Sequence, residues 1–172
     1  MAFSEMALPP NPPSPLLILG IGNYLVGDEG VGVHAVHALE KETWPAHVQV
    51  LDGGTGGFQL LDFFRTYSHI ILLDATRDGA PAGTVRCFEA RTPADFPPAL
   101  GAHDIGLRDL LSAAALLGPL PRIDVITVSV TDLVPMKLEL SPAVAAALPE
   151  VARQVRVLVG PDSADVETTN EH

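Results

Sequence analysis

The chain has 172 residues, of which 47% are hydrophobic and 18% charged, and its formal net charge is −11 at pH 7. This length favours one packed domain, and no stretch gathers Lys and Arg into a basic patch, so nucleic acid is not an expected partner. The single cysteine, Cys87, excludes an internal disulfide and a cysteine-based zinc cage. No segment has the composition of a signal peptide or the length of a membrane span, so we expect a cytoplasmic protein without a membrane partner.

Both ends of the chain differ in composition from the part between them. Residues 1–15 are rich in proline, which predicts a disordered tail. Residues 161–172 are acidic and are predicted to form a second disordered tail. One α/β domain is therefore expected over residues 16–160.

Predicted strands and helices alternate along the first part of this domain. The aliphatic run at 16–19 predicts a buried strand, and apolar residues at helical spacing follow at 33–39. The same pair of patterns recurs at 48–51 and 58–64, and a third buried strand is predicted at 69–74.

The second part of the domain is predicted to continue the alternation. Residues 84–89 follow a turn signal and predict a strand at the sheet edge, in which Cys87 is expected to be a buried, inert thiol. Residues 90–102 carry three prolines and predict a loop, before a helix at 107–117 with Asp104 as candidate N-cap. A strand is predicted at 123–130. Finally, Ser141-Pro142 opens a helix that Pro149 is expected to interrupt and that ends near Gly160.

This alternation predicts a three-layer α/β sandwich, in which a mainly parallel twisted sheet of about five strands carries helices on both faces. Functional residues in such folds lie at the carboxyl ends of the strands. The polar residues at these places are Asp28, Glu29, Asp52, Asp74 and, before the third long helix, His103. A Glu, an Asp and a His at one sheet edge suit a divalent metal such as zinc, nickel or manganese. Each of these residues taken singly is more often a cap or turn residue, but their equivalent positions favour a shared site.

The stretch GIGNYLVGDEG at residues 20–30 also resembles a phosphate-binding loop at first sight. A dinucleotide fingerprint needs a glycine three residues after Gly22, where Leu25 stands, and a Walker-type loop needs a lysine after Gly27, where Asp28 stands. The paired carboxylates would also repel a phosphate. We expect one of them to stabilise the following helix and the other to face the cleft.

Two histidines of the next predicted helix are further metal-ligand candidates. His34 and His37 are three residues apart, so they could share a helix face. A solvated face between apolar positions explains them better.

Four sequence blocks, GIGNYLVGDEGVG, LDGGTGG, IILLDAT and HDIGL, closely resemble in order and spacing the hydrogenase maturation endopeptidases. The resemblance covers roughly residues 16–160. It implies a cytoplasmic protease that removes a short C-terminal extension from the large-subunit precursor of a nickel–iron hydrogenase after nickel insertion. It also implies that Glu29, Asp74 and His103 form the metal-binding and catalytic cleft. Nickel would be delivered by the substrate, and zinc or cadmium could substitute for it in vitro.

The residues leave the mechanism open between a metal that polarises the scissile carbonyl and an aspartyl-type reaction, in which Glu29 or Asp74 activates water. A loop near the substrate is predicted from Asn23, Asp28, Asp52, Gly53, Gly54 and Thr55. We expect a monomer. Since no conventional nucleophile motif is present, the alternative function is a non-catalytic maturation module that grips a nickel-loaded partner or another ligand in the same cleft.

Overall fold

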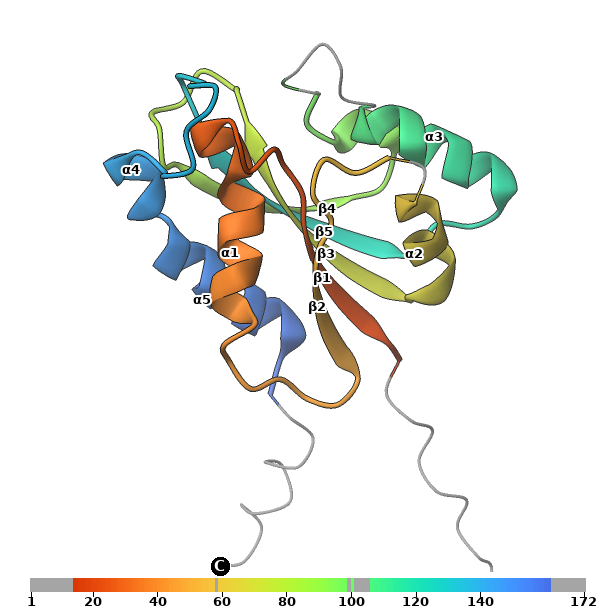
Figure 1. Cartoon of the computed structure of the whole chain (residues 1–172). Helices are drawn as coiled ribbons and strands as arrows, with labels where there is room; N and C mark the ends of the chain where they lie inside the picture. Colours follow the sequence, from red (N-terminus) through yellow and green to blue (C-terminus); the bar gives the residue numbers. More distant parts are fainter. Residues whose placement is uncertain (1–13, 58, 99, 101–105, 162–172) are drawn as a thin grey trace, which may run out of the picture.

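The computed structural model describes residues 14–57, 59–98, 100 and 106–161 (Figure 1). Most of the two predicted tails, residues 1–15 and 161–172, lies outside the described residues. The same holds for His103, the predicted third member of the metal cleft, and for Asp104, the predicted helix cap.

Within the described ranges, five strands form one sheet in the order β2-β1-β3-β5-β4. The strands are β1 (Leu16–Gly20), β2 (Val48–Asp52), β3 (His69–Thr76), β4 (Val85–Ala90) and β5 (Arg122–Ser129). Four of them are parallel, and β4 pairs antiparallel to β5 at the edge. The predicted mainly parallel sheet of about five strands is confirmed, as is the edge position of the strand predicted at 84–89.

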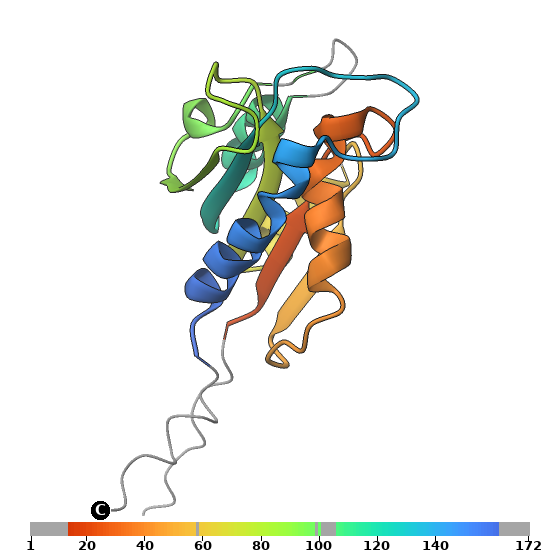
Figure 2. The ribbon, with the colours of Figure 1, turned by 90° about the vertical axis from the view of Figure 1, so that its left-hand side faces the viewer.

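Helices cover both faces of this sheet (Figures 1 and 2). The helices are α1 (Val31–Leu39), α2 (Leu60–Thr66), α3 (Leu107–Leu117), α4 (Pro142–Ala145) and α5 (Leu148–Val159), with short 3-10 turns η1 (Gly27–Gly30) and η2 (Pro93–Asp95). One face carries α1, α4 and α5, and the other carries α2 and α3. Within the described part of the chain, no helix is both long and apolar enough to cross a membrane.

The central strand β1 shows why its sequence is aliphatic throughout. All five of its residues are buried. Leu16 and Ile18 pack into the core beneath α1 and α5, whereas Leu17 and Leu19 pack into the core beneath α2 and α3. Since successive side chains of a strand point to opposite faces, a strand covered on both sides needs an apolar residue at every position.

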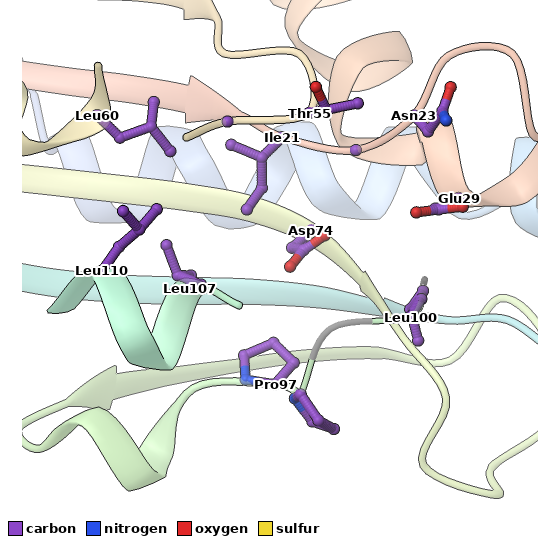
Figure 3. A pocket seen from close by; sticks show the side chains of 13 residues that line it. Ile21, Asn23, Glu29, Thr55, Leu60, Asp74, Pro97, Leu100, Leu107 and Leu110 are labelled. Atoms are coloured by element: carbon purple, nitrogen blue, oxygen red, sulfur yellow. The ribbon is translucent and has the colours of Figure 1, made fainter. Parts of the chain in front are cut away.

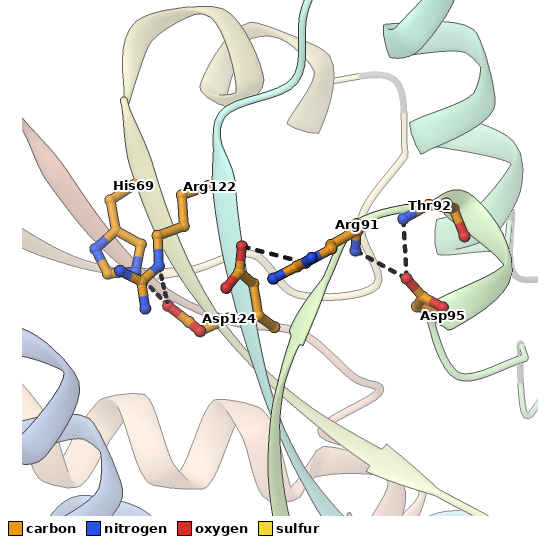
Figure 4. A network of polar contacts seen from close by, with 7 residues as sticks. His69, Arg91, Thr92, Asp95, Arg122 and Asp124 are labelled. Atoms are coloured by element: carbon orange, nitrogen blue, oxygen red, sulfur yellow. Dashed lines mark hydrogen bonds and ion pairs between the residues drawn. The ribbon is translucent and has the colours of Figure 1, made fainter.

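Two details of the predicted secondary structure differ from the structure. Pro149 does not interrupt a helix but lies in the first turn of α5, where its missing N–H costs no hydrogen bond. The break between α4 and α5 falls just before it. The proline-rich stretch at 90–102, predicted as loop, contains the short turn η2. There the Asp95 carboxylate accepts hydrogen bonds from the backbone N–H groups of Arg91 and Thr92, at 2.8 and 2.9 Å (Figure 4).

The prediction that Cys87 is buried is wrong. It lies in the edge strand β4, and its side chain is exposed. Partial desolvation, and secondarily the negative charge of Asp124, raise the pKa of the Cys87 thiol. A raised pKa lowers the thiolate fraction, so the predicted inertness of this cysteine agrees with its surroundings.

A network of polar side chains lies at the amino-terminal ends of the parallel strands β3 and β5 (Figure 4). His69 and Arg122 begin the adjacent strands β3 and β5 and pair in register. His69 Nε2 lies 2.6 Å and Arg122 Nε 3.0 Å from Oδ2 of the buried Asp124, and both donate to it. Since a buried carboxylate needs such partners, this cluster is a structural feature of the sheet.

Candidate active site

The site lies at the topological switch point of the sheet. Strand β1 has β2 on one side and β3 on the other, so the chain leaves β1 and β3 in diverging directions. Such divergence opens a crevice at the carboxyl ends of the two strands. Strand β1 ends at Gly20, which pairs with Leu73, so Asp74 stands one position beyond the end of its neighbour.

Glycines allow the loop after β1 to fold back tightly on this edge. Gly22 has φ +141°, and a Cβ there would lie 2.1 Å from the carbonyl oxygen of Glu29. At Gly32, in the first turn of α1, a Cβ would lie 2.3 Å from the carbonyl oxygen of Leu73. Both contacts need the absence of a side chain, and together they bring the segment that carries Glu29 against the end of β3.

A pocket of about 50 Å³ occupies the crevice (Figure 3). Its polar side chains are those of Asn23, Glu29, Thr55 and Asp74. The apolar lining comes from the first loop, the segment before α3 and the helices α2 and α3, with Ile21, Leu60, Pro97, Pro98, Leu100, Leu107 and Leu110. Two carboxylates from different strand ends therefore share one largely apolar pocket.

Glu29 and Asp74 are held differently. Glu29 lies in η1 and is only 7% exposed, whereas Asp74 is half-buried near the end of β3. Asp74 Oδ1 accepts a hydrogen bond of 2.8 Å from the backbone N–H of Ala75, which restricts the rotation of its carboxylate. Carboxylate oxygens are suitable ligands for a divalent cation, so the donor type of these two side chains is compatible with a metal. No cluster of three His, Cys, Asp or Glu side chains suited to a metal occurs among the described residues, and His103 is outside them.

The neighbouring acid, Asp28, has a structural partner far along the chain. Its Oδ1 accepts the backbone N–H of Ser141 and its Oδ2 accepts the Ser141 hydroxyl, both at 2.7 Å. Asp28 is 6% exposed and does not line the pocket of Glu29 and Asp74. Of the two adjacent acids, one therefore ties the first loop to the start of α4 and the other faces the crevice.

Replacing Ser141 by alanine is expected to destabilise the protein by about 1.5–3 kcal/mol, because it removes a hydrogen bond to a buried carboxylate. Urea denaturation would measure this loss. Ser112→Ala is the control, since the Ser112 hydroxyl only bonds within its own helix on an exposed face, and a change within about 0.5 kcal/mol is expected there. Equal stability losses in the two variants would contradict the role of Asp28.

The other residues predicted near the substrate divide into two groups. Asn23 lines the pocket and its Oδ1 accepts the backbone N–H of Leu25 at 3.0 Å, which braces the first loop as expected. Thr55 also reaches the pocket. Asp52 instead accepts the Gly54 N–H at 2.8 Å and pairs with His37 at 3.1 Å, and it lies outside the pocket lining with Gly53 and Gly54.

The predicted solvated histidine face of α1 is only partly correct. His37 is exposed and pairs with Asp52. His34 is half-buried: its ring stacks on Tyr24 with a centroid distance of 4.7 Å, and its Nε2 donates to the Leu138 carbonyl at 2.9 Å. His34 therefore helps to hold two loops together.

The apolar wall of the pocket was not predicted from the sequence. Leu107 and Leu110 lie in the helix predicted at 107–117, and they serve both the core and the pocket. Ile21 directly follows the first strand, which was a usable signal. No comparable signal identifies Pro97 as part of the wall, because a proline-rich loop has no regular periodicity from which its conformation could be predicted.

The family model described as hydrogenase maturation protease matches residues 33–156 of the chain. The chain belongs to the hydrogenase maturation protease family. This maturation protease is 35% identical over 147 residues to the hydrogenase 2 maturation protease of Escherichia coli K12, covering 81% of the chain and 87% of that protein. It is 34% identical to the hydrogenase expression/formation protein HupD of Rhizobium leguminosarum over 175 residues, and the match covers 94% of this chain and 87% of that protein.

Solved structures agree with this assignment. The hydrogenase maturating endopeptidase HybD from E. coli superimposes with a TM-score of 0.76 at 33% identity, covering 84% of this maturation protease and 91% of that chain. A hydrogenase 2 maturation peptidase from a thaumarchaeon superimposes with a TM-score of 0.68 at 28% identity, and the match covers 86% of this maturation protease and 99% of that chain. The predicted α/β fold and the resemblance stated from the four sequence blocks are both confirmed.

Proposed function

We propose that this protease removes the C-terminal extension of a nickel–iron hydrogenase large-subunit precursor after nickel insertion, using Glu29, Asp74 and His103. The observation that carries the proposal is that Glu29 and Asp74 line one pocket at the switch point of the sheet. The resemblance of the four sequence blocks to the maturation endopeptidases supports including His103 in the same set. We further propose that the enzyme works as a cytoplasmic monomer.

The nickel in this proposal belongs to the substrate. Glu29 and Asp74 supply hard oxygen donors that could contact it, and zinc or cadmium could take its place in vitro. A bound metal ion polarises a carbonyl oxygen as a Lewis acid. The same carboxylates could act as the base that takes a proton from the attacking water, in a pocket whose wall is largely apolar.

Processing of the precursor tests this proposal directly. The purified protein is incubated with nickel-loaded and with nickel-free precursor, and the mass of the large subunit is measured. Only the nickel-loaded form is expected to lose its C-terminal extension. If both forms stay intact, the protease proposal fails, and a stable complex with the nickel-loaded precursor would then favour the non-catalytic module.

A further inference from the structure

Exposed apolar side chains gather on two loops beside the pocket. We call this the rim patch, and it consists of Tyr24, Leu25, Val134, Met136 and Leu138. Leu25 is 54% and Met136 88% exposed. Exposed apolar residues grouped in this way mark interaction sites more often than single ones do.

The two loops of the rim patch are joined along their backbones. Val26 and Lys137 form a parallel bridge, in which the Gly27 N–H donates to the Lys137 carbonyl at 2.7 Å and the Lys137 N–H to the Leu25 carbonyl at 3.2 Å. Figure 2 shows the loop between β5 and α4 running beside η1. The Asp28–Ser141 and His34–Leu138 hydrogen bonds fasten the same pair of loops. The patch is therefore presented on a preformed backbone, which lowers the entropic cost of binding.

Met136 has an unusual backbone conformation for its residue type. Its φ is +59°, and no other residue except glycine has a positive φ in the described ranges. A bulky side chain in this left-handed region is strained, and such strain clusters at functional sites. Packing in the core does not explain it, because the side chain is almost fully exposed. The flexible thioether side chain suits contact with an irregular apolar surface.

The rim patch begins at the edge of the pocket. Asn23 lines the pocket, and Tyr24 and Leu25 follow it directly on the outer side of the loop. A protein whose tail enters the pocket would bring its body against these side chains. We propose that the rim patch docks an apolar surface on the folded body of the hydrogenase precursor, next to its C-terminal tail. This inference rests on the proposed function, because it takes the precursor as the occupant of the pocket.

Binding of the nickel-free precursor to the full-length protein tests the docking surface, since under the proposed function this form is not cleaved. Dissociation constants are measured for the wild type, Leu25→Asp and Met136→Asp. Each substitution is expected to raise the dissociation constant about tenfold or more, because a carboxylate would be desolvated in an apolar contact. Leu116→Asp is the matched control: Leu116 is 89% exposed on α3, outside the patch and the pocket, and a change below about twofold is expected.

Kinetics with the nickel-loaded precursor separate docking from chemistry. The two patch variants are expected to raise KM about tenfold while kcat stays close to that of the wild type. Circular dichroism melting confirms that each variant is folded. Unchanged affinity in both variants, or no measurable binding of the nickel-free precursor by the wild type, overturns the docking inference. So does a wild-type dimer that both substitutions convert to a monomer. If the wild type binds the precursor and both substitutions weaken this binding, but the wild type does not cleave the nickel-loaded form, the proposed function alone is overturned.

Discussion

Replacing Glu29 by glutamine is expected to lower the rate of precursor processing by about 10²–10⁴-fold and to leave the protein folded. Glutamine keeps the size of the side chain but carries no negative charge, so it neither binds a divalent cation strongly nor accepts a proton from water. Glu29 lines the pocket from η1 and is nearly buried, so its charge acts in a partly dehydrated space. Asp74→Asn is expected to have an effect of the same order, because Asp74 approaches the same pocket from β3.

The measurement is single-turnover processing of nickel-loaded precursor, followed by mass, with thermal unfolding to show that the variants are folded. Asp52→Asn is the matched control. It is an acid at the same edge of the sheet, but it bonds to Gly54 and His37 and lies outside the pocket lining. Cys87→Ala, on the exposed edge strand, should also process normally. If Asp52→Asn abolished processing and Glu29→Gln did not, the site would have to be relocated.

The strands could be predicted from the sequence because burial on both faces requires aliphatic side chains at consecutive positions. Residues 16–19 of β1 and 70–73 of β3 meet this requirement. The edge strand β4 has no such aliphatic run and is only partly buried, and Cys87 within it is exposed although it was predicted to be buried. Burial at a sheet edge depends on which loops and helices reach it, and local periodicity carries no information about that.

The shared location of the candidate site residues could be predicted from a general property of parallel sheets, whereas the different partners of the two adjacent acids could not. Asp74 and the acids after the first strand were expected at the strand carboxyl ends, and Glu29 and Asp74 do line one pocket. That Asp28 would be the structural member of the pair could not be predicted, because its partner Ser141 is 113 residues away. The half-buried state of His34 has the same origin, since it depends on Leu138.

Gly32→Ala is expected to destabilise the protein by about 2 kcal/mol, although alanine in place of glycine normally stabilises a helix by about 1 kcal/mol. The added Cβ would lie 2.3 Å from the carbonyl oxygen of Leu73 and 2.4 Å from that of Ile21. Both are backbone atoms in the region where the first loop meets β3, and Leu73 O already accepts the Ile21 N–H at 3.0 Å. Since neither atom can rotate away as a side chain would, α1 must shift outward.

This shift would also reach the pocket. Leu73 directly precedes Asp74, and Ile21 lies in the pocket lining, so moving α1 from the sheet changes the separation of the two carboxylates. Processing should therefore fall even at temperatures where the variant is fully folded, as judged by urea denaturation and circular dichroism. Ala38→Gly is the control in the same helix: this exposed position should lose about 1 kcal/mol from helix propensity and keep its activity. A Gly32→Ala variant as stable and active as the wild type would mean that the close approach of α1 to the switch point is not what positions the site.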